Sequence, residues 1–205
     1  MHWSWYNRHG TRGTQAPSDV HPAYLERADC SRTNHSQFLP YPSTQMGDHQ
    51  EMYQRFTVVF DEVFEWIRAK LKQCLPEEYE VMSMVARALP GNAFSPAEPF
   101  TSIVLNINVR TQVHRDRQDR EFCLVLAIGQ FQGGSLVLVE PGLVLELRQG
   151  DFVVFRSPEV SHLNLDYTGE RASLVLHTDR EMDSWVWNQN GWGHNVTLKF
   201  FRYDT

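Results

Sequence analysis

The stretch SIVLNINV, residues 102–109, decides the fold, because from here on the apolar residues follow a period of two. Alternation of this kind is typical of β-strands. Six further short segments rich in Val, Ile, Leu and Phe follow, at 122–128, 135–139, 143–147, 152–155, 161–165 and 172–176. Glycine and proline pairs such as Gly133-Gly134 and Pro141-Gly142 separate them. So many closely spaced strands predict an antiparallel sandwich or barrel.

Upstream of the strands, residues 49–75 predict a helix, because apolar side chains recur at steps of three and four. The residues on this face are Phe56, Val59, Phe60, Val63, Phe64, Ile67, Leu71, Cys74 and Leu75. Pro76 ends the helix, since it has no backbone donor, and residues 77–89 predict a second short helix. We expect the aromatic stripe to dock on the outside of the sheet, in a mainly β protein with flanking helices.

The predicted domain organisation is one globular unit with an extension. Residues 1–48 are polar and without periodicity, which predicts an irregular arm around the core. Residues 49–205 form a single domain, with helices at 49–89, strands at about 100–180 and an aromatic segment at 181–205.

Composition excludes several classes of protein. The chain of 205 residues is 41% hydrophobic, has a net charge of −6, and contains no apolar run of bilayer-spanning length. Its three cysteines form neither a disulfide framework nor a zinc pattern. We expect an intracellular monomer with no membrane partner, either nuclear or cytoplasmic, and no attraction of the whole molecule to nucleic acid.

A candidate metal site stands in this β region. His114 and Asp116 are two positions apart, so in extended chain their side chains share one face, and His162 opens a later strand. Two imidazoles and one carboxylate leave coordination positions open, which suits non-haem Fe(II) with a chelating co-substrate and dioxygen. These ligands do not exclude zinc or manganese, and the alternative for the first pair is a surface loop with an incidental histidine.

The segment RASLVLH, residues 171–177, adds a fixed cation. Alternation places Arg171, Ser173 and His177 on one face. An arginine that points into a barrel is costly unless it meets an anion, and its fork binds a carboxylate such as that of 2-oxoglutarate through two hydrogen bonds. Ser173 can add a third. The alternative is an exposed strand end, with Arg171 paired to Glu170.

Two asparagines share a face of the segment 102–109. Asn106 and Asn108 place carboxamides in an otherwise apolar strand, which suggests a polar interior. They can bond the co-substrate or substrate or position a metal ligand, and structural asparagines that bond a loop are an equal alternative.

These motifs resemble the Fe(II)/2-oxoglutarate dioxygenase superfamily, and most closely the TET/JBP-like dioxygenases of fungi. The resemblance covers about residues 100–192. The motifs that carry it are His114-Arg115-Asp116, Gly133-Gly134-Ser135-Leu136, Gly150-Asp151-Phe152, His162 and Arg171-Ala172-Ser173-Leu174-Val175.

The resemblance implies a double-stranded β-helix, the jelly-roll core of this superfamily. Iron would be held by the two histidines and the aspartate, and 2-oxoglutarate by Arg171 with Ser173 assisting. In TET enzymes the residue three after the ligand aspartate and the aromatic six after the arginine touch the flipped base. Those positions hold Asp119 and His177 here, and Asp119 can accept from an exocyclic amine.

Four arginines surround the first ligand pair: Arg110, Arg115, Arg117 and Arg120. They can grip phosphates at the mouth of a pocket, or lie on a solvated loop and pair with Asp119 and Glu121. Likewise Trp185, Trp187 and Trp192 can stack with bases or simply pack against the core.

Three functions follow. The first is oxidation of a methylated base in DNA, 5-methylcytosine or N6-methyladenine. The second is the same iron chemistry on a small metabolite, amino acid or peptide. The third is a non-catalytic β-barrel binding module, which the intact triad and Arg171 disfavour.

Overall fold

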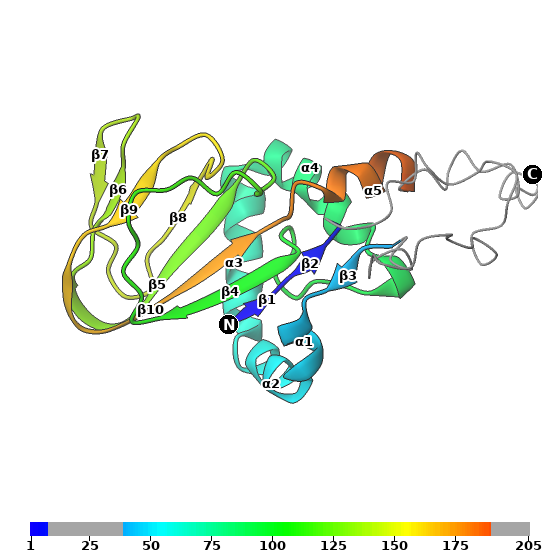
Figure 1. The fold of residues 1–205 in the computed structure, drawn as a ribbon, viewed down its shortest axis with the longest axis horizontal. Coiled ribbons are helices and arrows are strands. Elements are labelled where there is room, and N and C mark those ends of the chain that lie inside the picture. Colours follow the sequence, from blue (N-terminus) through cyan, green and yellow to red (C-terminus); the bar gives the residue numbers. More distant parts are fainter. Residues whose placement is uncertain (8–38, 190–205) are drawn as a thin grey trace, which may run out of the picture.

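The computed structural model describes residues 1–7 and 39–189, and two antiparallel sheets make up its centre (Figure 1). The larger sheet has the strand order β1-β4-β10-β5-β8, and the smaller has the order β7-β6-β9. The strands of the larger sheet are β1 (His2–Trp3), β4 (Ser102–Ile107), β5 (Cys123–Gly133), β8 (Phe152–Phe155) and β10 (Tyr167–His177). Those of the smaller sheet are β6 (Leu136–Leu138), β7 (Leu143–Leu145) and β9 (His162–Asn164). This rolled pair of sheets confirms the predicted mainly β, jelly-roll class.

One apolar core lies between the two sheets. Val125 and Ala127 of β5 pack there with Leu136 and Leu138 of β6, and all four are buried. Strand alternation sends the intervening residues of β5 to the opposite face.

Strands β5 and β10 are longer than the sequence pattern predicts. They pair in register from Tyr167 opposite Gly133 to Leu176 opposite Leu124. The extra length contains Gly129 and two glutamines, which do not mark a strand, and it exists because the two strands satisfy each other's backbone.

A second apolar core lies on the outer face of the larger sheet, where helix α3 packs across it (Figure 1). The buried helix residues Phe64, Ile67 and Leu71 share this core with Leu124 and Leu174 of the sheet. The predicted docking of the aromatic stripe is therefore confirmed.

The helical region is more divided than predicted. Its helices are α1 (Thr44–Asp48), α2 (Gln50–Val59), α3 (Asp61–Cys74) and α4 (Pro76–Arg87), with a short 3-10 turn at Pro90–Asn92. The single helix expected over 49–75 is wrong, because Phe60 has φ −96° and ψ 8° and separates α2 from α3. The break leaves Val59, expected on the docking face, 75% exposed. Pro76 does end α3, and it begins α4 at the first helical position, where a missing N–H costs nothing.

The expected irregular arm is partly ordered, and the prediction is wrong for the parts of residues 1–48 that the structure describes. Besides β1 and α1, it contains β2 (Trp5–Tyr6) and β3 (Tyr41–Pro42), which pair with each other. Strands of two residues are too short to show a period, so the sequence pattern could not reveal them.

The last described element is α5 (Met182–Asn188), a helix where the sequence predicted an aromatic, turn-rich segment. The indole Nε1 of Trp185 donates to the carbonyl oxygen of Ala88 at 2.5 Å, which ties α5 to the end of α4, whereas Trp187 is 79% exposed. Trp192 and a further strand considered near the C-terminus lie outside the described residues. Across the described residues, none of the helices has the length and apolar character that crossing a bilayer requires.

Candidate metal centre and substrate cavity

The two candidate histidine ligands lie directly opposite each other on neighbouring segments. The backbone N–H of His114 donates to the carbonyl of His162 at 3.1 Å, and that of His162 donates to the carbonyl of His114 at 2.9 Å. The third candidate ligand is held separately, since the N–H of Asp116 donates to the carbonyl of Ser157 at 3.1 Å. Backbone hydrogen bonds therefore fix the positions of the three Cα atoms from which the candidate ligands extend.

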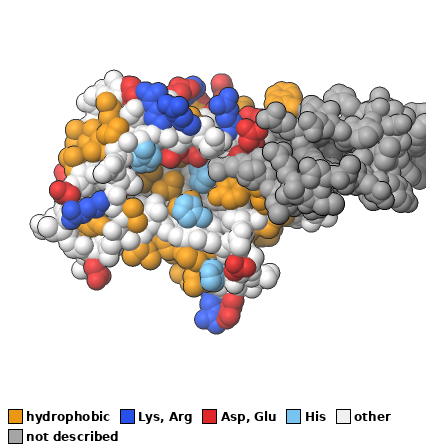
Figure 2. Space-filling model, in the orientation of Figure 1, with side chains coloured by type: hydrophobic (Ala, Val, Ile, Leu, Met, Phe, Trp, Pro, Cys, Tyr) orange, Lys and Arg blue, Asp and Glu red, His pale blue; other side chains and the backbone are white. Residues whose placement is uncertain are grey.

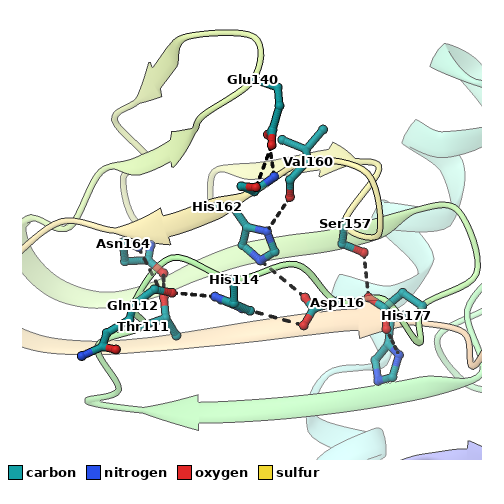
Figure 3. A network of polar contacts seen from close by, with 12 residues as sticks. Thr111, Gln112, His114, Asp116, Glu140, Ser157, Val160, His162, Asn164 and His177 are labelled. Atoms are coloured by element: carbon teal, nitrogen blue, oxygen red, sulfur yellow. Dashed lines mark hydrogen bonds and ion pairs between the residues drawn. The ribbon is translucent and has the colours of Figure 1, made fainter.

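The three side chains converge, as Figure 3 shows. Nε2 of His162 lies 3.4 Å from one oxygen of Asp116, and Nε2 of His114 lies 3.8 Å from the other. One ligand atom from each residue falls within 4.8 Å of the others. Such a triangle of two nitrogens and one oxygen can bind one divalent ion on a single face.

The outer nitrogen of each histidine ring has a partner that can only accept. Nδ1 of His114 lies 2.7 Å from the carbonyl of Gln112, and Nδ1 of His162 lies 3.1 Å from that of Val160. We therefore assign the proton to Nδ1 in both rings, which leaves the lone pair of Nε2 facing the triad. This is the usual arrangement around metal-binding histidines, so the donor set fits a divalent ion.

The charges of the triad support one another. Burial raises the pKa of the Asp116 carboxyl, but the hydrogen bond and charge of His162 and the charges of His114 and His177 together outweigh burial and lower that pKa below its usual value. Burial lowers the pKa of His162, but Asp116, the Val160 carbonyl and the charge of Asp119 together more than reverse this effect, so that pKa is raised. Asp116 is therefore a carboxylate near neutral pH, as metal binding requires.

Arg171 is buried with unsatisfied donors. Its side chain is 4% exposed, and its Nε and Nη2 have no hydrogen-bond partner among the described residues. Its guanidinium lies over the rings of Phe131 and Tyr167, at 5.3 and 5.8 Å from their centroids. Burial lowers the pKa of Arg171. Because a buried cation with free donors is costly without an anion, this site fits the carboxylate of a co-substrate.

A cavity of about 580 Å³ adjoins the triad and contains most of the predicted polar residues. Asn106, Ser173 and His177 line this cavity. Arg171 precedes Ser173 by two residues on the same face of β10, but it does not line the cavity. Asn108 does not line it either, because its side-chain oxygen accepts from the backbone N–H of Arg171 at 3.1 Å. Its geometry matches the alternative of a structural asparagine.

The two residues predicted to touch a base lie together in this cavity. Nδ1 of His177 is 2.9 Å from one oxygen of Asp119, and the hydroxyl of Ser157 donates to the other at 2.7 Å. Asp119 and His177 are 7% and 9% exposed. A carboxylate has about four lone-pair sites, so Asp119 keeps acceptor capacity toward the cavity.

The family model of the Tet_JBP oxygenase domain, which belongs to the 2OGFeDO superfamily, matches residues 36–180, well over half of the chain. The chain belongs to this family. Members of the superfamily use Fe(II), 2-oxoglutarate and dioxygen, and the triad and Arg171 of this Tet_JBP domain have the donor sets that these require.

Comparison with solved structures shows the same fold. NgTET1, solved in complex with 5mC DNA, is 20% identical and has a TM-score of 0.58 over 72% of this chain. That match covers 58% of the NgTET1 chain, so the Tet_JBP domain described here spans little more than half of its length.

Two oxygenase structures match smaller parts of the domain. A 2OG-Fe(II) oxygenase family oxidoreductase from Burkholderia pseudomallei is 26% identical, and covers 38% of this chain and 42% of its own. A Pseudomonas putida prolyl-4-hydroxylase is 29% identical, and covers 38% of this chain and 52% of its own. Both have TM-scores of 0.33, too low to carry an argument. A search of curated proteins finds no match.

Three of the four arginines around the Tet_JBP triad are already paired. Arg110 binds Asp166 at 2.9 Å. Arg115 binds Glu140 at 2.5 Å. Arg120 binds Asp183 at 2.6 Å. These carboxylates differ from the predicted Asp119 and Glu121, so the expected pairing is right in kind but wrong in its partners.

Arg117 is the exception. It lines the cavity and is exposed. None of the ion pairs found in the described part of the chain involves it.

Other residues of the site were not predicted. Glu140 accepts from the backbone N–H and the hydroxyl of Ser161, at 2.6 and 2.7 Å, as well as from Arg115. These bonds lower the pKa of Glu140 to about 2, the Ser161 hydroxyl contributing most and Arg115 next. Glu140 thus joins the residue between the first two ligands to the residue before the third.

Asn164 and Thr111 form a further missed pair in the cavity wall. The Thr111 hydroxyl donates to the side-chain oxygen of Asn164 at 3.1 Å, and both residues line the cavity. Asn164 is two positions after His162, so the strand alternation that placed Ser173 beside Arg171 could also have found it.

Proposed function

We propose that this protein is an Fe(II)- and 2-oxoglutarate-dependent dioxygenase that oxidises a methyl group of a nucleobase in DNA, 5-methylcytosine or N6-methyladenine. The observation that carries the proposal is the buried Asp119–His177 pair, placed in the same cavity as the converging triad. Family membership supports the chemistry, and the DNA in the NgTET1 structure supports the substrate class.

His114, Asp116 and His162 would hold the iron, and Arg171 with Ser173 would bind the carboxylate of 2-oxoglutarate. Together these cofactors and dioxygen convert a C–H bond to C–OH, with 2-oxoglutarate becoming succinate and carbon dioxide. The protein's own part is to hold Nδ1–H of both histidines on carbonyl oxygens, to keep Asp116 ionised, and to place the substrate's methyl group beside the triad.

The cavity can recognise a base through defined groups. A base inside a duplex cannot reach a buried carboxylate, so it must leave the stack and enter the cavity. Asp119 would accept from the exocyclic amine, which cytosine and adenine both carry, and the imidazole of His177 would contact the ring. Arg117 at the cavity is the residue available for a phosphate contact.

One observation favours a second candidate, oxidation of a small metabolite, amino acid or peptide. Ion pairs occupy three of the four arginines that could grip a DNA backbone, and the net charge is −6. A small substrate would need only the cavity and not the surface around it.

The test is mass spectrometry after aerobic incubation with Fe(II) and 2-oxoglutarate. The substrates are duplexes with 5-methylcytosine, duplexes with N6-methyladenine, and a panel of metabolites, amino acids and peptides. Oxidised nucleoside in proportion to succinate is expected. Asp116→Ala should abolish both products, whereas Asp48→Ala, which removes an exposed carboxylate of α1, should leave both unchanged.

The other outcomes are distinct. Succinate with an oxidised metabolite and no oxidised nucleoside would establish the second candidate. Oxidation of none of these substrates, without succinate above the Asp116→Ala background, would contradict both.

A further inference from the structure

The strand β1 closes one edge of the larger sheet, and it lies before the residues that the family model matches. It pairs with β4 in antiparallel register, His2 opposite Val104 and Trp3 opposite Ile103 (Figure 1). Trp3 is 1% exposed and packs against Phe56, with ring centroids 4.9 Å apart. A buried tryptophan therefore anchors β1 to the helical face of the sheet.

Strand alternation turns His2 to the opposite face, which is the cavity face. A row of paired residues crosses the sheet there: His2 opposite Val104, Val104 opposite Val175, and Val175 opposite Val125. All four line the cavity. His2 thus extends the cavity wall by one strand, and Tyr6 lines the same cavity.

The backbone of His2 is held on both sides. Its N–H donates to the side-chain oxygen of Gln45 at 2.7 Å, and its carbonyl accepts from the hydroxyl of Ser43 at 2.7 Å. The hydroxyl of Ser43 also caps α1, because it accepts from the N–H of Met46. The wall that β1 forms is therefore fixed by two residues at the start of α1, Ser43 and Gln45.

The His2 side chain is exposed, and it lines the same cavity as Asp119 and His177 of the proposed base site. Partial burial is the main cause that lowers the pKa of His2, followed by the charge of the Met1 amino group and that of His177. The neutral form of its ring is therefore favoured near pH 7. A neutral imidazole offers a flat face, one hydrogen-bond donor and one acceptor. In Figure 2 histidine side chains lie across this face of the molecule, with apolar side chains between them.

We propose that β1 is a substrate-specificity element, in which the side chain of His2 forms a wall of the base pocket on the side of His177 and contacts the planar heteroaromatic ring of the substrate; this rests on the proposed function. Residues 36–180, which the family model matches, therefore do not form the whole base pocket. Residues before this range supply the remaining part.

The test is steady-state oxidation of whichever of the two methylated duplexes the wild type oxidises, by the full chain and its His2→Ala variant. Loss of a stacked aromatic contact predicts a KM for the duplex raised by about fivefold or more, with kcat changed less. The dissociation constant for 2-oxoglutarate should stay as in the wild type, because His2 is not among the groups that bind it. His2→Phe restores a flat ring and should recover part of the loss in KM.

The matched control is His49→Ala, because His49 is an exposed histidine between α1 and α2 and makes no side-chain capping bond. It should behave as the wild type. Wild-type KM in His2→Ala would overturn this inference alone. Oxidation of neither duplex by the wild type would instead overturn the proposed DNA substrate, and this inference with it.

Discussion

His114 and His162 exchange two backbone hydrogen bonds, so the two imidazole ligands start from one rigid bridge between segments 48 residues apart. Main-chain pairing therefore sets the spacing of the two histidine ligands, and this spacing does not depend on a bound metal. It follows that removing a ligand side chain should leave the fold intact, which allows binding and folding to be measured separately.

Arg171→Lys should weaken 2-oxoglutarate binding by about tenfold to a hundredfold. A lysine keeps the charge but loses the planar fork, and hydrogen bonds to a charged group contribute about 1.5–3 kcal/mol. The measurement is titration of 2-oxoglutarate into the anaerobic Fe(II) protein. Arg110→Lys, at an exposed pair with Asp166, is the control and should bind normally. Equal affinity for 2-oxoglutarate in both variants would show that Arg171 does not bind the co-substrate.

Gly134→Ala should disturb Arg171 without touching the metal ligands. A Cβ at Gly134 would lie 3.3 Å from Cδ and Nε of Arg171, and the φ of +70° is strained for alanine. Gly142→Ala has a similar φ of +66° but meets nothing within 4 Å. Gly142→Ala should lose about 1–2 kcal/mol of stability. Gly134→Ala should lose at least as much, because its Cβ would also lie 3.2 Å from Cβ of Tyr167, and only this variant should also bind 2-oxoglutarate more weakly. Unchanged binding in Gly134→Ala would show that the guanidinium moves freely.

Glu140→Gln should lower the affinity for Fe(II) by at most about tenfold, the low end of the 10- to 100-fold contribution of groups that bond metal ligands directly, because Glu140 bonds the chain neighbours of the ligands and not the ligands themselves. The neutral side chain keeps its size but loses the charge that binds Arg115 and Ser161. Titration with Fe(II) without oxygen measures the effect. Glu159→Gln, at an exposed pair with Arg156, serves as the comparison. Identical metal affinity in the two variants would limit Glu140 to a surface contact.

The same carboxylate predicts a dependence of stability on pH. Because the folded pKa of Glu140 is about 2 and the ordinary value is 4.5, its stabilisation is complete above pH 4.5. It is lost as the pH falls through 4.5 toward 2. Urea unfolding of wild type and Glu140→Gln should therefore differ at pH 6 and converge near pH 2. A difference that does not change with pH would contradict this assignment.

Arg117→Ala should weaken DNA binding and reduce the slope of log K against log salt by about 1, as expected for one lost phosphate contact. Arg156→Ala removes an exposed, paired arginine that does not line the cavity, and should keep the wild-type slope. Fluorescence anisotropy with a methylated duplex at several salt concentrations makes the measurement. An unaltered slope in Arg117→Ala would leave the cavity without its phosphate contact and favour a small substrate.

The sequence predicted those parts of the site that depend on local periodicity. His114 and Asp116 share a face of extended chain, and Ser173 and His177 share one of β10, so alternation alone found them. Glu140 and His2 were missed because their roles depend on which strands and loops are neighbours in space. For Asn108 the alternation was misleading. It follows the last residue of β4 and has a positive φ of 53°, so its side chain leaves the face that it was predicted to share with Asn106.

The strands were predicted well because each buries one face, and a buried face leaves a period in the sequence. The break at Phe60 and the two-residue strands left no such period. They result from packing between segments distant in sequence, as with Trp3 against α2.

The central claim is that His114, Asp116 and His162 bind one ferrous ion that also binds 2-oxoglutarate. The most direct measurement is the visible absorption of the anaerobic protein with Fe(II) and 2-oxoglutarate. We predict a weak charge-transfer band in the wild type that is lost in His114→Ala and in Asp116→Ala, while both variants unfold near the wild-type urea midpoint. Persistence of the band in both variants would contradict the account.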